Sequence, residues 1–375
     1  MADPSNPAAS PVHDSARRVA LVLGGGNGLG AYLAGAYEQL DRAGIGLDWI
    51  VGSSIGAVTG AILAGNAPEE RLGKLAEFWA EATLHTGAAP LRHGRFRQIY
   101  NGVHTAATML LGRPNIFRGR YPGAWSILPW MPDDVALYDL APLRCALERL
   151  VDFDRLNRAE VRYTAAAVDV ETGEEVYFDN TRQRLGPEHV VASASIMPTY
   201  PPTAIDGRLY CDPGYTTNLP VDVPFHEQGE GDLLCIGVEL FSPRGPRPTS
   251  LDAATERAHD LVFASAPRRT IEALRREHAL HEQLRPDGPR ATLLHVAYQA
   301  AGDELAGKTF DYSPSSIADR RAAGRRDMAS GLALLGRAGR EGARFHYLRV
   351  EPDLAATHAE AGAASEAGPA LGRAA

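Results

Sequence analysis

The pentapeptide Gly52-Ser53-Ser54-Ile55-Gly56 constrains the fold of this 375-residue chain most strongly, because it lies between an apolar strand and a helix of small residues. A strand that reverses sharply into a helix needs glycines where backbones would otherwise clash, and the strained turn exposes a serine Oγ. Ser54 has glycine two residues to either side and fits such a nucleophile elbow. Ser53 does not, since β-branched Val51 and Ile55 flank it at the same spacing. The pattern predicts Ser54 as a nucleophile.

A glycine-rich loop precedes the elbow. Residues 19–23 form an all-apolar predicted strand, which runs through residues 24–30, GGGNGLG, into a predicted helix over 30–43. Glycines let bare N–H groups converge at a helix N-terminus, where the dipole favours negative charge, so this loop predicts the donors of an oxyanion hole. A dinucleotide-binding unit also begins with strand, glycine loop and helix. That alternative is weaker, because the Gly-x-Gly-x-x-Gly spacing is absent and the second strand ends in the elbow rather than in an acidic residue.

A serine nucleophile needs a general base, and residues 205–214 supply a candidate. They are predicted to form a hairpin whose second strand delivers Asp212 at a Pro-Gly turn, where a carboxylate can face a cavity. Asp also caps such turns without any catalytic role, and the local sequence favours that simpler interpretation. The chain offers twelve histidines as other candidates.

Composition excludes several functional classes. The net charge of −8 gives no basic footprint for nucleic acid, and the irregular spacing of the three cysteines argues against disulfides and a zinc site, so core thiols are expected. We expect no metal and no organic cofactor. The apolar run near the N-terminus is too short for a signal peptide or a membrane span, which predicts a cytoplasmic location with peripheral membrane contact as the alternative.

The elements predict one α/β domain over residues 17–350, between disordered tails at 1–16 and 351–375. Residues 49–51 are the second strand, and residues 162–170 and 175–179 form a hairpin. Long helices are predicted from about 251 to 284 and from 313 to about 340, with further strands at 233–240, 292–298 and 344–350. Residues 88–135 are rich in Arg, Gly, Pro and aromatic residues with weak periodicity, and form either a lid or acyl-chain wall over the sheet or an ordinary surface excursion.

These pieces together resemble the patatin-like phospholipases of bacteria. The similar segments are LVLGGGNGLGAYLAGAYEQL, the elbow with AILAGN, PTYPPTAIDGRLYCDPG and TTNLPVD, across roughly residues 19–241. The resemblance implies a three-layer α/β/α fold with a central, mostly parallel sheet. It also implies a Ser–Asp dyad that works without histidine, in which Ser54 is the nucleophile, Asp212 the base, and Gly25 and Gly26 lead the oxyanion hole.

Two positions depart from the pattern of that family. Its glycine loop commonly reads Gly-Gly-Gly-x-Arg-Gly, whereas Leu29 stands at the arginine position when the loop is aligned without a gap through Gly30. Pro213 stands where the family usually has glycine. Because proline fixes φ and removes an N–H, the turn after Asp212 requires a φ near −65° at Pro213.

The resemblance predicts a serine acyl hydrolase that cleaves ester bonds of lipids, of unknown oligomeric state. Acyl transfer and thioester cleavage would use the same site, and a lipid-binding protein with an impaired dyad is the non-catalytic alternative. A histidine triad on an α/β-hydrolase fold would run Ser54, Asp212 and then His259, His278 or His295. It is disfavoured because Ser54 follows only about two strands, whereas several precede the nucleophile in that fold.

Overall fold

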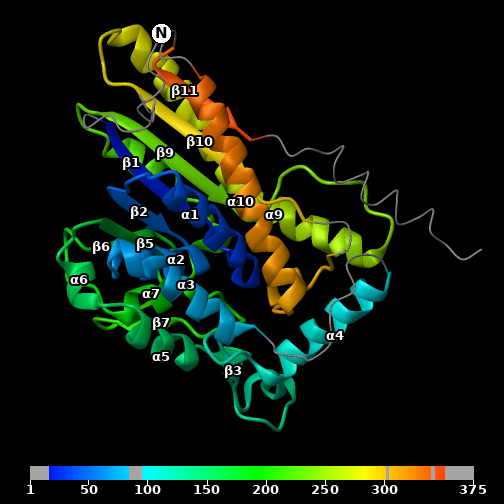
Figure 1. Cartoon of the computed structure of the whole chain (residues 1–375). Helices are drawn as coiled ribbons and strands as arrows, with labels where there is room; N and C mark the ends of the chain where they lie inside the picture. The colour runs from blue at the N-terminus through cyan, green and yellow to red at the C-terminus, as the bar shows by residue number, and fades with distance from the viewer. Residues whose placement is uncertain (1–16, 84–94, 301–303, 339–342, 351–375) are drawn as a thin grey trace, which may run out of the picture.

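The computed structural model describes residues 17–83, 95–300, 304–338 and 343–350 (Figure 1). The tails predicted to be disordered, 1–16 and 351–375, lie outside the described residues, as do the first residues of the 88–135 excursion. No helix among the described residues is both long enough and apolar enough to cross a bilayer.

A nine-stranded mixed sheet organises the described residues, in the order β11-β10-β9-β1-β2-β5-β8-β7, with β6 also paired to β5. Neighbours from β11 to β5 run parallel, whereas β6 and β8 are antiparallel to β5, and β7 is antiparallel to β8. The strands are β1 (Arg17–Leu23), β2 (Trp49–Gly52), β5 (Arg162–Asp169), β6 (Glu175–Asp179), β7 (Thr203–Ile205), β8 (Arg208–Cys211), β9 (Asp232–Glu239), β10 (Ala291–Ala297) and β11 (Phe345–Arg349). A separate small ladder joins β3 (Arg118–Gly119) to β4 (Tyr138–Asp139).

Helices cover both faces of this sheet. The α-helices are α1 (Ala31–Arg42), α2 (Ile55–Ala64), α3 (Pro68–Ala82), α4 (Arg95–Leu111), α5 (Ala141–Leu150), α6 (Phe153–Asn157), α7 (Pro187–Ala194), α8 (Asp222–His226), α9 (Leu251–Leu284) and α10 (Pro314–Arg337). The 3₁₀ turns are η1 (Asn27–Gly30), η2 (Gly123–Ile127), η3 (Pro213–Tyr215) and η4 (Lys308–Phe310).

Alternate residues of β1 belong to two separate hydrophobic cores. Leu21 and Leu23 pack into the larger core with α1, α2, α3, α5, α7 and α10. Ala20 and Val22 face the opposite way and pack into a smaller core with α9 and the segment leading into α8. A strand with apolar residues on both faces is what a central parallel strand requires. The predicted three-layer α/β/α arrangement with a mostly parallel sheet is therefore confirmed.

Two glycines let α1 and α10 cross closely, side by side on one face of the sheet (Figure 1). A Cβ built on Gly35 of α1 would lie 1.9 Å from the carbonyl oxygen of Arg321, and one built on Gly324 of α10 would lie 2.1 Å from that of Tyr32. Neither position has room for a side chain, so these glycines set the spacing between the two helices.

Most predicted elements are found within a few residues of their expected ends, including the hairpin of β5 and β6 and the long helix α9. Two expectations need correction. The 88–135 excursion contains a regular helix, α4, although periodicity over the excursion as a whole is weak. Cys145 is exposed on α5 rather than buried, whereas Cys211 and Cys235 are core thiols as expected.

Candidate active site

The elbow has the strained geometry that its glycines predict. Ser54 lies between β2 and α2 with φ 55° and ψ −126°, a conformation that residues with a side chain rarely adopt. A Cβ on Gly52 would lie 2.5 Å from the Cα of Ala57, and one on Gly56 would lie 2.1 Å from the carbonyl oxygen of Leu23. Both flanking glycines are therefore required by close backbone contacts.

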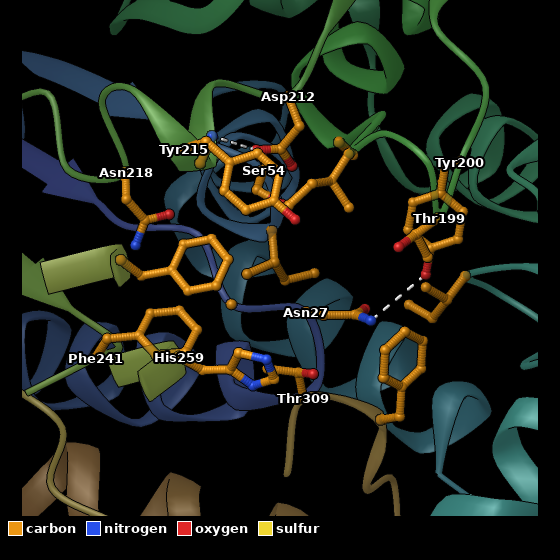
Figure 2. A pocket seen from close by; sticks show the side chains of 18 of the residues that line it. Asn27, Ser54, Thr199, Tyr200, Asp212, Tyr215, Asn218, Phe241, His259 and Thr309 are labelled. Atoms are coloured by element: carbon orange, nitrogen blue, oxygen red, sulfur yellow. Dashed lines mark hydrogen bonds between the residues drawn. The ribbon is translucent and has the colours of Figure 1, made fainter. Parts of the chain in front are cut away.

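The register of the sheet brings Asp212 to the same edge as Ser54. Gly52, the last residue of β2, is opposite Ala165 of β5, and Cys211, the last residue of β8, is opposite Val168, three residues further along β5. The residues that follow the two strands therefore approach one another alongside β5, between Ala165 and Val168. Figure 2 shows the side chains of Ser54 and Asp212 next to each other at one end of the cavity.

Backbone hydrogen bonds fix the two residues. The N–H of Ser54 donates to the hydroxyl of buried Ser193 on α7 (3.0 Å), and the N–H of Asp212 donates to the carbonyl oxygen of Ser195 (3.1 Å), just beyond the same helix. The end of α7 thus holds both residues in one orientation. Neither serine was singled out by the sequence, where nothing marks them as partners of segments so distant along the chain.

Pro213 is compatible with the turn that holds Asp212. It occupies the first position of η3, where a fixed φ suits the helical turn and the missing N–H would have had no intrahelical acceptor. The next residue supplies the donor, since the N–H of Gly214 bonds Asp212 Oδ1 at 2.7 Å. Asp212 therefore caps this turn, as the simpler interpretation expects, and also lines the cavity that contains Ser54.

Burial raises the pKa of Asp212 to about 7. The cost of desolvating the carboxylate is the dominant cause, and hydrogen bonding from the Ser54 hydroxyl and the Gly214 amide partly offsets it. A carboxyl group with a pKa near neutrality exchanges protons readily at physiological pH, which is what a general base requires.

The glycine loop lies against both residues. A Cβ on Gly25 would lie 2.9 Å from Ser54 Cβ and 2.6 Å from Asn218 Oδ1, so only glycine fits between them. The Gly25 N–H donates to the carbonyl oxygen of Asn218 (3.2 Å), whereas Gly26 and Asn27 line the cavity itself. Asn27 has φ 51°, a left-handed conformation that asparagine tolerates better than most residues.

Ser54 and Asp212 open into a cavity of about 470 Å³. Its walls are mainly aliphatic and aromatic, and they come from α2, α5, α9 and the segments around residues 116, 200, 241 and 310. Asn27 and Tyr200 face each other inside it, with Asn27 Nδ2 at 3.5 Å from Tyr200 Oη (Figure 2). An apolar cavity with a few converging polar groups is typical of a small-molecule binding site.

The three candidate histidines take different positions. His259 lines the cavity from α9 and is exposed. His295 is buried under α9, where its Nε2 lies 2.9 Å from Glu239 Oε2, and His278 stacks on Phe345 with 4.5 Å between ring centroids. Neither His278 nor His295 lines the cavity that holds Ser54.

Two asparagines lie near the site: Asn27, which stands within the predicted glycine loop, and Asn218, which sequence reasoning missed. Asn218 is buried and donates through Nδ2 to the carbonyl oxygen of Gly25 (3.3 Å), and the Oδ1 of Asn27 accepts a hydrogen bond from the hydroxyl of Tyr312. Asn218 belongs to the similar segment TTNLPVD, so that segment was the available signal. Among the described residues, no three His, Cys, Asp or Glu side chains are grouped as metal ligands would be.

A comparison with solved structures finds matches at low sequence identity and low TM-score. VipD from Legionella pneumophila is 14% identical with a TM-score of 0.42, over 86% of this chain and 67% of VipD. The type III effector protein ExoU is 13% identical with a TM-score of 0.36, over 85% of this chain and 53% of ExoU. Human GIVD cytosolic phospholipase A2 is 13% identical with a TM-score of 0.28, over 60% of this chain and 43% of the human protein.

The chain thus spans about two thirds of VipD and about half of ExoU. A search of curated protein sequences found no significant match. The family described as patatin-like phospholipase matches residues 21–225, which contain the glycine loop, the elbow and Asp212. Because that match covers more than half of the chain, the protein belongs to the patatin-like phospholipase family.

Proposed function

We propose that this protein is a serine acyl hydrolase that cleaves acyl ester bonds of lipids with a Ser54–Asp212 dyad. One observation carries the proposal: Ser54 on the nucleophile elbow and the buried carboxyl group of Asp212, with a pKa of about 7, meet at the end of one apolar cavity. Family membership supports lipid hydrolysis as the reaction class. The residue roles rest on the family resemblance of the sequence and on the geometry of the site.

The reaction would begin with transfer of the Ser54 hydroxyl proton to Asp212, while Oγ attacks the ester carbonyl carbon. The proton would enter at Oδ2, because Oδ1 already accepts the Gly214 N–H. Protonated Asp212 then gives the proton to the departing alcohol oxygen. In the second half Asp212 takes a proton from a water molecule, which attacks the acyl carbon, and then gives that proton to Ser54 Oγ as the fatty acid leaves.

The negative oxygen of the tetrahedral intermediates needs donors on the loop side of Ser54. We assign the backbone amide of Gly26, and with it that of Asn27, since both residues line the cavity. The Gly25 amide, also expected in this set, would have to leave the carbonyl oxygen of Asn218 to join them. Helix α2 begins directly after Ser54, so its N-terminal dipole adds further stabilisation of negative charge. One such donor contributes about 10² to 10³ in rate.

The apolar walls of the cavity favour a lipid or other acyl-ester as the substrate, because binding of its hydrocarbon chain would remove these walls from contact with water. Acyl transfer to a second alcohol and thioester cleavage would proceed through the same acyl-Ser54. A lipid-binding protein without turnover is the remaining alternative. Action in the cytoplasm or at a membrane surface fits the proposal equally.

Hydrolysis by purified protein tests the function. We expect release of fatty acid from phospholipids and of p-nitrophenol from short-chain esters, and Ser54→Ala should lower kcat/KM by about 10⁴ or more. Ser53→Ala is the matched control, because Ser53 is the neighbouring buried serine and its hydroxyl has no partner among the described residues. A Ser54→Ala variant that keeps full activity, or a wild type inactive on every ester, would refute the proposal.

A further inference from the structure

Exposed apolar side chains gather on the excursion between α3 and α5. Twelve of the nineteen large hydrophobic side chains that are exposed in the described structure lie in residues 95–137. Scattered exposed hydrophobic residues are ordinary, but a concentration in one short segment marks an interaction surface. This surface has two parts, the outer side of α4 and the loop of residues 121–131, which project beyond the body of the molecule (Figure 1).

The loop 121–131, YPGAWSILPWM, has no charged residue. The exposed fractions of Trp125, Ile127 and Trp130 are 62%, 86% and 76%, and Tyr121 is also exposed. Tryptophan and tyrosine pair an apolar ring with a polar atom, so they favour the boundary between lipid headgroups and acyl chains. A loop with this composition suits shallow insertion into a lipid surface.

Hydrogen bonds to Asp134 fix the base of the loop 121–131. Both carboxylate oxygens of Asp134 accept the Nε–H of Arg120 at 2.8 Å, and Asp134 also accepts the N–H of Gly123 (3.1 Å) and of Val135 (2.8 Å). The two ends of the loop are thereby tied together. Its apolar side chains stay presented outward instead of folding back onto the protein, which lowers the conformational cost of binding a surface.

Helix α4 carries its apolar side outward. Phe96, Ile99, Val103 and Leu110 recur at helical spacing and are exposed. The opposite side is polar and buried: Asn101, His104, Thr105 and Thr108 face inward, and Arg97 pairs with Asp319 at 2.7 Å. This is the reverse of a helix on a protein surface in water, where the apolar stripe faces the core. An apolar medium outside the protein is the environment that such a helix fits.

The surface is continuous with the wall of the active-site cavity. The chain leaves that wall at Ile116 and returns to it at Leu140, and both residues line the cavity. Between them Phe117 packs against Tyr138 with 4.7 Å between ring centroids, and Tyr138 donates its N–H to the carbonyl oxygen of Thr199, another lining residue. The apolar loop therefore rises from the wall of the cavity.

Charge favours a lipid surface over a basic partner. Residues 95–137 contain five arginines and two aspartates, a net charge of +3 in a chain of net charge −8. Arg118 and Arg120 lie next to the uncharged loop in the sequence, and they pair with Asp139 and Asp134 in the folded protein.

We propose that α4 and the loop 121–131 dock this protein on a phospholipid bilayer and place the cavity against the acyl chains of its substrate. The part of this inference that concerns the substrate rests on the proposed function. Docking to the bilayer does not require the protein to hydrolyse the lipid. Binding can therefore be measured in a Ser54→Ala background, where failure to bind is distinguishable from failure to catalyse.

Sedimentation with vesicles tests the docking. Full-length Ser54→Ala protein is mixed with vesicles of phosphatidylcholine alone, or of three parts phosphatidylcholine to one part phosphatidylglycerol. We expect binding to both, and at least about a tenfold weakening when Trp125→Ala and Trp130→Ala are combined. Leu280→Ala with Leu284→Ala is the matched control, because these residues are equally apolar and exposed but lie at the far end of α9. The control should bind like the parent.

Intrinsic fluorescence gives a second readout. The chain has four tryptophans, of which Trp49 and Trp79 are buried and Trp125 and Trp130 are exposed. A shift to shorter wavelength on adding vesicles, with quenching by brominated acyl chains, would therefore report on the loop. The shift should disappear when both loop tryptophans are replaced by phenylalanine while sedimentation is retained.

Three results would overturn the proposal. One is wild-type affinity for vesicles in the Trp125→Ala, Trp130→Ala variant. Another is binding only to vesicles that contain phosphatidylglycerol, without an emission shift, which would indicate electrostatic adsorption elsewhere. The third is a lipid-free dimer that the same two substitutions convert to a monomer, which would assign the surface to a second copy of the chain.

Discussion

At the scale of single residues, the dyad depends on the environment of Asp212. Asp212 is 5% exposed, and no cationic side chain is among the causes that shift its pKa. Burial therefore dominates and disfavours the charged form. A carboxylate that is poorly solvated in this way is a stronger base than one in water. This partly compensates for the high pKa of the serine hydroxyl from which it takes a proton.

The pKa of Asp212 predicts how activity depends on pH. A protonated carboxyl cannot accept the Ser54 proton, and the raised pKa extends protonation from the usual acidic range to about pH 7. We expect kcat/KM to rise about tenfold per pH unit below this pKa and to level off above it. The profile should be measured with a neutral ester, so that the substrate does not titrate. An inflection near pH 4, or a flat profile between pH 5 and 9, would contradict the assignment of Asp212 as a buried base.

The sequence was sufficient to predict Ser54 as a nucleophile, because the Gly-x-Ser-x-Gly spacing is itself local. Gly52 is required by a local contact with Ala57, whereas Gly56 is required by the backbone of Leu23 on β1. Asp212 needed the family resemblance in addition, since a capping Asp and a catalytic Asp have the same local sequence. Contributions from distant segments were not predictable. Asn218 contacts a loop 193 residues earlier, and Ser193 bonds an amide 139 residues earlier. Such pairs become neighbours only when the sheet has formed.

At the scale of elements, the packing of α1 against α10 places a strong demand on two glycines. The helical backbones approach each other where a methyl group would overlap a carbonyl oxygen. Nothing in the local sequence shows that Gly35 or Gly324 is required. From sequence alone, a glycine within a helical pattern only argues against the helix. Their role follows from the partner helix, nearly three hundred residues away.

Substitution by alanine should have different effects at two glycines of α10. Gly324→Ala should lower the free energy of unfolding by about 2 kcal/mol or more, because the helices must separate to admit a methyl group. Gly336→Ala should leave it unchanged or raise it by up to about 1 kcal/mol, since nothing lies within 4 Å of that position and alanine favours helix. Urea unfolding followed by circular dichroism measures both. Equal effects at the two positions would contradict the close crossing.

Helix α4 shows why the 88–135 excursion could not be resolved from sequence. Apolar residues at helical spacing normally identify the side of a helix that faces the core. Here they lie on the exposed side, and the buried side is polar. Sequence alone cannot distinguish these two orientations, because both give the same periodicity.

At the scale of the whole molecule, the topology gathers the site at one edge of the sheet. The glycine loop follows β1, the elbow follows β2, and Asp212 follows β8, whose antiparallel pairing to β5 places its end near that of β2. Ligand sites in open α/β sheets commonly form where strands end in this way. The α/β class and the order of elements were predictable from apolar runs and turn residues. The branch of the sheet at β5 was not, because strand neighbours depend on contacts between distant segments.

The rate and site of covalent labelling by a fluorophosphonate test the Ser54–Asp212 dyad most directly. We expect one adduct, mapped by mass spectrometry to Ser54, with labelling slowed about 10²-fold or more by Asp212→Asn and little changed by His259→Ala. Circular dichroism of each variant would verify that it is folded. Labelling at another serine, an undiminished rate in folded Asp212→Asn, or loss of labelling in folded His259→Ala would contradict a two-residue mechanism.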